Sequence, residues 1–482
     1  MNYQRYKLLC KLNDKILLNH KNSISYISNN WLHFIRLNSV YIKSYSQPLN
    51  NLSTIIIIYF SKTFKYLLNS FFKIVHSVWR NYIKKEILNI ENKYDYIFIS
   101  HLLNESIINN NQDFYFYNFP EKIESEGKKS LIVYINYVGK INTKFNINPS
   151  RTKKVILPIY LGLFSEIGLR FELFLNAFKI LFFNSNSLKT KLIASFEYLS
   201  PASHFNLRLG KRIEGIIKKT EAKMIFTTFE GHAWERVVYA SSRKINPNIK
   251  CVGYQQAIIF NSQHSVIRSL GDFFDPDFIL CSGQYSFRKI KNANLVDENK
   301  LLLFGSNRTT GLVNEIKKKN KTILFLPEGD LKEVLLLIDL AYDLACKNSD
   351  YKFILRFHPL TNVKKLINKR SYLNSLPSNI ELSRDSLEED FNKSFFAIYR
   401  GSTSIIKAIE FGLVPIFYNS SNERHNDALE DIKFRYELSD NIEFLKITSI
   451  SEEILKENLI SLRSEIKNFF SPLDYTIINK LK

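Results

Sequence analysis

The chain has 482 residues, more than one compact core usually holds, so we expect about two domains or three. Hydrophobic residues make up 45% and charged residues 23%, which is ordinary for a globular protein and excludes a mainly disordered chain. Lys and Arg number 67 against 46 Asp and Glu, so the net charge is +21. This excess predicts an anionic partner: nucleic acid, an anionic membrane surface or a phosphorylated substrate.

The four cysteines, Cys10, Cys251, Cys281 and Cys346, are scattered without CxxC or other metal-ligand spacing. They predict free thiols in a reducing, cytoplasmic compartment. Charges interrupt the apolar stretches near the start, unlike a secretory signal. The longest apolar run there, residues 55–60, is far short of the ~20 residues that span a bilayer. We therefore expect no transmembrane helix.

Residues 1–90 are basic and aromatic, and their pattern predicts a helical extension. Within it, residues 55–79 carry an apolar stripe bordered by basic side chains, which is typical of an amphipathic helix. Two interpretations stay open for this helix: peripheral binding to the inner face of an anionic cytoplasmic membrane, or packing on its own protein. The stripe consists of Phe60, Phe64, Leu67, Leu68, Phe71, Phe72 and Val75.

From about residue 91, short apolar runs alternate with helical stretches, as in parallel α/β sheets. We assign residues 91–260 to an N-terminal Rossmann-like domain and residues 261–482 to a C-terminal Rossmann-like domain, with a hinge near 257–275. The expected fold class is therefore α/β, with two Rossmann-like domains facing a cleft and a helical N-terminal extension. The expected strands are 94–100, 130–138, 154–161, 223–229 and 250–256, then 277–283, 300–306, 322–329, 351–359, 379–383, 395–403 and 413–419.

Polar side chains follow three strands of the second series, at the strand ends where ligands bind in such folds. A glycine turn with three hydroxyls opens a helix there and suits a phosphate, although Ser404 can also serve as a helix cap. A histidine held by a proline can donate to a phosphate or protonate a leaving group, or it is a structural loop residue. The strand ends are Glu328-Gly329, Arg356-Phe357-His358-Pro359 and Arg400-Gly401-Ser402-Thr403-Ser404.

A histidine-proline pair at one strand end, then GSTS opening a helix, then GLVPI on the next strand resembles GT-B glycosyltransferases. The closest resemblance is to groups with cytidine-activated donors: bacterial sialyltransferases, Kdo transferases and teichoic-acid glycerophosphotransferases. The run FEGHAWER at 229–236 resembles surface-carbohydrate biosynthesis proteins. The resemblance covers roughly residues 94–420.

This resemblance implies roles for individual residues. His358, beside Pro359, would contact the donor phosphate and assist its departure. Glu328 and Gly329 would lie near the base or ribose. Many GT-B enzymes have a ribose-binding Glu where this chain has Lys407, so either Glu410 substitutes for it or Lys407 meets an anionic donor group. The phosphate would be held by Ser402, Thr403 and Ser404 after Gly401, and an acidic donor sugar would be favoured by Arg356, Arg400 and Lys407.

The first domain is expected to supply the acceptor site and a catalytic base. Glu230 and His232 follow strand 223–229, with Gly231 allowing a sharp turn, and a carboxylate there can deprotonate an acceptor hydroxyl. Alternatively, Glu230 caps the helix that begins near residue 233. Glu235 and Arg236 have the pattern of packing or salt-bridge partners. His101, Gln255 and Gln256, at neighbouring strand ends, are further candidates for the cleft.

Asp275-Pro276-Asp277 is a literal DxD, but it precedes a strand and favours a turn, so we interpret it as structural and expect no metal or other cofactor. The sequence thus predicts a metal-independent glycosyltransferase of bacterial surface-polysaccharide assembly. It would transfer a sugar, such as a nonulosonate or Kdo-like acid, from a nucleotide donor, with CMP favoured, to a glycan or lipid-linked acceptor. Three alternatives stay open: a UDP-sugar 2-epimerase, a non-catalytic GT-B-fold protein and a nucleic-acid binder. No basic stripe or module favours the last.

Overall fold

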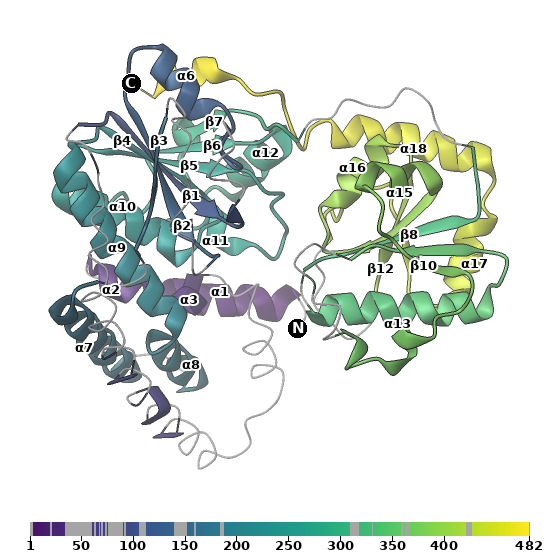
Figure 1. Ribbon diagram of the computed structural model, residues 1–482, viewed down its shortest axis with the longest axis horizontal. Coiled ribbons are helices and arrows are strands. Elements are labelled where there is room, and N and C mark those ends of the chain that lie inside the picture. The colour runs from purple at the N-terminus through teal and green to yellow at the C-terminus, as the bar shows by residue number, and fades with distance from the viewer. Residues whose placement is uncertain are drawn as a thin grey trace.

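The computed structural model places two parallel β-sheets in separate lobes, each flanked by helices (Figure 1). It describes residues 3–19, 22–33, 60–61, 64–66, 68, 71–72, 75, 90, 93–105, 112–138, 152–158, 161–183, 188–308, 318–329, 331–357, 361, 366–420 and 427–481. Each predicted strand is present in these residues, and both sheets are parallel throughout the pairings that define them. Because such sheets are buried on both faces, their strands are nearly continuous apolar runs.

The first sheet has seven strands in the order β3-β2-β1-β4-β5-β6-β7. Its last two strands correct the predicted domain division. β6 pairs with β5, with Val252 opposite Phe278, and β7 pairs with β6. The boundary at 260 and the assignment of 277–283 and 300–306 to the second sheet are therefore wrong. The strands are β1 (Tyr96–Leu102), β2 (Ser130–Asn136), β3 (Lys153–Ile156), β4 (Met224–Thr228), β5 (Lys250–Gln255), β6 (Phe278–Cys281) and β7 (Leu301–Leu303).

The predicted hinge near 257–275 is likewise wrong, because the chain returns to the first sheet with β6 and β7 after this segment. Ile258 and Phe260, at its start, are buried in a cluster with residues of the second sheet, whereas its later part packs inside the first domain. Val266 and Phe274 are fully buried, and the carbonyl oxygen of Ser265 accepts a hydrogen bond from the buried Arg236. The polar sequence that suggested a hinge instead satisfies a buried guanidinium.

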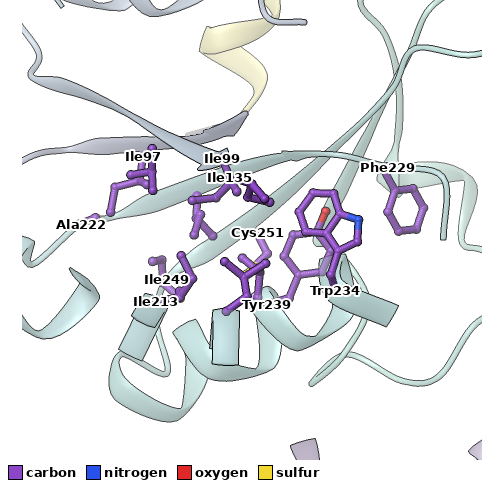
Figure 2. Close-up of a cluster of buried hydrophobic side chains, with 14 of the residues drawn as sticks. Ile97, Ile99, Ile135, Ile213, Ala222, Phe229, Trp234, Tyr239, Ile249 and Cys251 are labelled. Atoms are coloured by element: carbon purple, nitrogen blue, oxygen red, sulfur yellow. The ribbon is translucent and has the colours of Figure 1, made fainter. Parts of the chain in front are cut away.

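Helices cover both faces of the first sheet. α9 begins after Ser200, whose hydroxyl caps the backbone N–H of Ser203, and its first residue is Pro201, which suits a helix start. Figure 2 shows the apolar core beneath these helices, where Ile97 and Ile99 of β1 belong to the same cluster as Tyr239 and Trp234 of α10. The helices are α6 (Phe119–Ser125), α7 (Leu163–Lys179), α8 (Leu188–Tyr198), α9 (Pro201–Thr220), α10 (Ala233–Ile245), α11 (His264–Ile267) and α12 (Gln284–Ala293).

The N-terminal segment begins with α1 (Tyr3–Leu17), α2 (Ile24–Ile27) and α3 (Asn30–His33), which pack on the first domain. Trp31 and Leu32 are buried in the same cluster as residues of α7, α8 and α10. Asp14 lies 2.5 Å from both His264 Nε2 and Arg268 Nε, which fixes α1 to the segment around α11. Within 55–79, residues 60–61, 64–66, 68, 71–72 and 75 are described, and all are helical.

The second sheet has six strands in the order β10-β9-β8-β11-β12-β13. β13 (Tyr436–Leu438) was not predicted, since three residues carry too little pattern. The other strands are β8 (Thr322–Pro327), β9 (Lys352–Leu355), β10 (Ile380–Leu382), β11 (Phe396–Arg400) and β12 (Val414–Tyr418), and the helices are α13 (Leu331–Lys347), α15 (Leu387–Lys393), α16 (Ser404–Glu410), α17 (Asn441–Ser449) and α18 (Glu452–Ile466).

After α18 the chain returns from the second domain to the first (Figure 1). The ring of Phe469 stacks on Tyr285 with centroids 4.2 Å apart, and Tyr475 packs against Phe119 and Phe304. Two parallel-sheet α/β domains joined in this way form the expected GT-B architecture. None of the helices within the described ranges is long and apolar enough to cross a membrane.

Candidate active site

A pocket of about 570 Å³ opens at the carboxyl ends of β1, β2, β4 and β5 in the first domain. It is the place where ligands bind in parallel α/β sheets. Both predicted catalytic residues of this domain, Glu230 and His232, line it together with His101 and Gln256. Gln255 differs from the prediction, because it is fully buried and the pocket wall contains Gln256 but not Gln255. The remaining walls are Asn30, Leu103, Tyr115, Tyr137, Pro201, Ala202, Phe205, Asn206, Thr228 and Trp234.

The turn after β4 depends on Gly231. This glycine has a φ of +79°, which side-chain-bearing residues rarely adopt. A Cβ atom at this position would lie 2.1 Å from the carbonyl oxygen of Ser265. The close approach is fixed by Ser265 Oγ, which donates to the carbonyl oxygen of Glu230 at 2.9 Å. The predicted sharp turn is therefore confirmed, and it holds Glu230 and His232 on either side of the glycine.

The buried side chain of Glu235 stabilises this turn through hydrogen bonds to its backbone. It accepts hydrogen bonds from the backbone N–H groups of Glu230, at 2.9 Å, and His232, at 2.7 Å. Burial raises the pKa of Glu235 to about 7, against the lowering effects of His232 and of these hydrogen bonds. Since Glu235 provides the acidic cap of α10, the interpretation of Glu230 as that cap is wrong. The side chain of Glu230 is instead part of the pocket wall.

Two histidines accompany Glu230 in the pocket. The Nε2 atom of His232 lies 3.7 Å from a carboxylate oxygen of Glu230. His101 Nε2 lies 3.2 Å from the hydroxyl of Thr228. Burial, with a further contribution from His232, lowers the pKa of His101 to about 4, while Glu230 acts in the opposite direction. His101 is therefore neutral near pH 7 and serves as a hydrogen-bonding group rather than a cation.

Arg236 and the aspartates of the DxD, Asp275 and Asp277, form hydrogen bonds that stabilise the segments next to this pocket. The fully buried Arg236 donates to Asp275 at 3.0 Å and to the carbonyl oxygen of Gly231 at 2.9 Å. Asp277 accepts from Arg243 at 2.9 Å and from the backbone N–H of Cys251 at 2.7 Å. These contacts confirm that Arg236 is a salt-bridge partner and that both aspartates are structural.

The predicted donor site lies on the second sheet, where β8 and β11 are neighbours. Pro327 pairs with Arg400, so Glu328 and Gly329 follow one strand where Gly401 follows the other. Gly401 has a φ of +74°, and a Cβ atom there would lie 2.6 Å from a carboxylate oxygen of Glu328. The structure thus brings Glu328 and the glycine turn together.

The hydroxyl groups after this turn form a small cluster. Thr403 is the N-cap residue of α16, so the interpretation of Ser404 as the cap is wrong. The Oγ atoms of Ser402 and Ser404 lie 2.7 Å apart. Glu410, at the end of α16, accepts a hydrogen bond from Arg463 through its carbonyl oxygen at 2.9 Å. The predicted glycine turn with its hydroxyl groups is therefore present, and its role in binding a phosphate stays a prediction, whereas Glu410 adjoins α18.

The three cations that were expected to favour an acidic donor each contact an acidic side chain. Arg400 is fully buried and pairs with Glu333, while its Nη1 donates to the carbonyl oxygen of Tyr418. Arg356 pairs with the buried Asp390 at 2.6 Å. Lys407 pairs with Glu388. These carboxylates offset the charges that were expected to favour an acidic sugar, and the donor roles of the three cations stay predictions. His358 and Pro359 lie outside the described residues, and their roles stay predictions.

Sequence reasoning missed the aromatic walls of the first-domain pocket. Tyr115, Tyr137 and Trp234 surround the His101 ring, with centroids 5.1 to 5.5 Å away. Tyr137 directly follows β2, so its place at a strand end was a usable signal. Phe205 lies within α9, away from any strand end, and carried no such signal.

No protein-family model and no curated protein matches this chain. Solved structures resemble it at low identity. A UDP-GlcNAc 2-epimerase from Methanocaldococcus jannaschii is 12% identical, with 74% of this chain and 92% of that one covered and a TM-score of 0.42. A glycosyltransferase from Rickettsia africae is 17% identical, with coverage of 81% and 97% and a TM-score of 0.44. MurG from Acinetobacter baumannii is 10% identical, with coverage of 80% and 98% and a TM-score of 0.41.

Proposed function

We propose that this protein is a glycosyltransferase that moves a sugar from a nucleotide donor to an acceptor hydroxyl bound in the first-domain pocket. The observation that carries the proposal is the position of Glu230. Glu235 and Ser265 form hydrogen bonds with the backbone N–H and carbonyl groups of Glu230. The Glu230 side chain lines a pocket that has aromatic walls. Aromatic side chains in a pocket suit the apolar faces of sugar rings, and a carboxylate there suits a general base.

In the proposed reaction, Glu230 takes the proton of the acceptor hydroxyl. The acceptor oxygen then forms a bond to the anomeric carbon of the donor sugar, and the bond from that carbon to the donor phosphate breaks. The phosphate leaves with the nucleotide and the bonding electron pair. His232, 3.7 Å from Glu230, would orient the base, and the neutral His101 would hydrogen-bond the acceptor. His358 is proposed, from the sequence motif, to assist the departing phosphate.

The donor is proposed to bind at the carboxyl ends of β8 and β11. Ser402, Thr403 and Ser404 would hold its phosphate, and Glu328 and Gly329 would approach the base or ribose. We keep CMP as the favoured nucleotide and surface-polysaccharide assembly as the setting, on the strength of the motif. The acceptor is proposed to be a glycan or lipid-linked, with residues 1–90 on the inner face of an anionic membrane. An acidic donor sugar no longer has the support of three available cations.

The first experiment measures thermal unfolding of the whole protein with CMP, UDP and GDP in turn. A ligand that binds only the folded state raises the unfolding temperature. We expect CMP to give the largest rise. If none of the three nucleotides raises it, the donor-site proposal fails.

The second experiment uses Glu230→Gln, which keeps the shape of the side chain and removes the base. With the CMP-sugar and a glycan acceptor, we expect transfer to fall by about 100-fold or more, with nucleotide binding unchanged. The matched control is Glu126→Gln, an exposed glutamate after α6. Undiminished transfer by Glu230→Gln would remove Glu230 from the mechanism, and isomerisation of a sugar nucleotide without any acceptor would favour the epimerase alternative.

A further inference from the structure

Helix α7 has apolar side chains on two opposite faces. One face, with Leu169, Leu173 and Ala177, is buried in the first domain. The other face repeats large apolar residues at helical spacing, and Phe164 is 86% exposed, Phe171 62% and Phe178 55%. Ile167, Phe174 and Leu175 are exposed on the same face. A helix that is apolar all round is normally covered on every side, so this face calls for a further partner.

A second set of exposed aromatic side chains lies at the same end of the molecule. Phe64 and Phe71, among the helical residues described between 60 and 75, are 67% and 65% exposed. Tyr66, in the same stretch, joins it to the domain, because its hydroxyl lies 2.8 Å from His204 Nε2 and interacts with Arg170 of α7. Figure 1 shows these residues beside α7 and α8.

The sequence around these aromatic residues is basic and contains no acidic residues to offset the positive charge. Residues 15–85 contain ten Lys or Arg and no Asp or Glu, so this segment alone supplies about half of the net charge of +21. Lys65 and Lys179 are exposed beside the two aromatic sets. The charge argues against a second copy of this chain as the cover, because two such segments would repel each other. It is complementary to an anionic lipid surface, which attracts basic residues that lie near it.

We infer that the exposed face of α7, together with the aromatic residues between 60 and 75, inserts into the interface of an anionic bilayer. This surface extends the membrane contact beyond the predicted residues 1–90 into the first domain itself. α7 would lie parallel to the membrane plane, with its phenylalanine rings at the boundary between headgroups and acyl chains, as interfacial helices do. The opposite face stays bound to the domain through Glu166, which pairs with Arg208 of α9 at 2.6 Å.

This placement bears on the pocket. α9 packs against α7, and its first turns contribute Pro201, Ala202 and Phe205 to the pocket wall. A bilayer under α7 therefore holds the pocket close to the lipid surface. For this consequence alone the inference rests on the proposed function: the acceptor class it selects is a lipid-linked one, presented from the membrane.

The test is co-sedimentation of the full-length protein with vesicles of phosphatidylcholine alone or with 30% phosphatidylglycerol. The variant Phe164→Ser/Phe171→Ser/Phe178→Ser removes three exposed rings from α7. We expect the parent protein to bind the anionic vesicles and the variant to bind them more weakly, by a factor of about ten or more. Binding should also weaken in 0.5 M NaCl, because salt screens the lysine–lipid attraction.

The matched control is Ile442→Ser/Ile454→Ser/Ile460→Ser, which removes three exposed apolar side chains from the second domain. It should bind as the parent does. Equal vesicle binding by the α7 variant and the parent would overturn the inference, as would equal binding to neutral and anionic vesicles. So would a lipid-free dimer that the α7 variant converts to a monomer. None of these measurements involves a nucleotide, so their failure is distinct from failure of the proposed transfer reaction.

Discussion

The polar loops at the carboxyl ends of the two sheets have similar residue types but different surroundings. After β4, a buried glutamate and a buried arginine bind backbone groups of the turn, and Glu230 and His232 remain in a pocket wall. After β11 and β9, the charged side chains themselves are used for packing, since Arg400 and Arg356 pair with Glu333 and Asp390. A charged residue beside a motif thus indicates a ligand site only when other residues form the ion pairs and hydrogen bonds that stabilise the loop.

The largest expected effect comes from Arg400→Met in the second domain. Removing this buried guanidinium leaves Glu333 and the carbonyl oxygen of Tyr418 without their donor. Breaking a buried ion pair in this way costs about 3 kcal/mol or more of unfolding free energy. Urea unfolding, monitored by circular dichroism, measures the loss.

The control for this variant is Arg384→Met, an exposed arginine that should change the unfolding free energy by no more than about 0.5 kcal/mol. If Arg400→Met unfolds like the parent but loses nucleotide binding, the side chain serves the donor after all. The contrast between the two loops would then disappear.

The strand pattern and the positions of the site residues were predictable, because both are local properties of the sequence. Buried parallel strands are continuous apolar runs, and polar residues at their ends point to a site wherever the strands pair. The Glu328 loop therefore lies beside Gly401 as expected. The sequence did not show which sheet β6 and β7 join. A strand of three or four residues has the same apolar pattern in either sheet.

Two other features were not predicted, for different reasons. The pairs Arg400–Glu333 and Lys407–Glu388 join residues that are far apart in the chain, so the sequence showed the cations without their partners. Helix α7 was missed because its apolar residues occupy two opposite faces. The single apolar stripe on which helix prediction depends is absent from such a helix.

A smaller and pH-dependent effect is expected from His101→Gln in the first-domain pocket. Burial lowers the pKa of His101 to about 4, whereas a histidine in the unfolded chain has a pKa of about 6.5. The folded protein therefore binds a proton at His101 less readily than the unfolded chain does. The resulting stability is complete above the unfolded pKa and is lost as the pH falls toward 4. Between pH 7 and pH 5 the loss attributable to His101 is about 2 kcal/mol.

In His101→Gln this part of the acid sensitivity should be absent, which urea unfolding at pH 7 and pH 5 measures. The pKa of His204 is also lowered by burial, but it contributes equally in both proteins, so their difference isolates His101. An identical loss of stability in the two proteins would mean that the His101 side chain is hydrated in the pocket.

The smallest effect is expected from Lys407→Met, and it separates the two interpretations of the donor site most sharply. Lys407 and Glu388 are both partly exposed, so their ion pair contributes no more than about 1 kcal/mol to the unfolding free energy. If the pair persists with nucleotide bound, removing the lysine should change the Kd for CMP by less than about threefold, as measured by calorimetry. A tenfold weakening, equal to about 1.4 kcal/mol, would mean that Lys407 leaves Glu388 to bind the donor. Glu388→Gln provides the converse: it releases Lys407 from its partner, so tighter CMP binding by this variant would show that the carboxylate competes with the donor for the lysine.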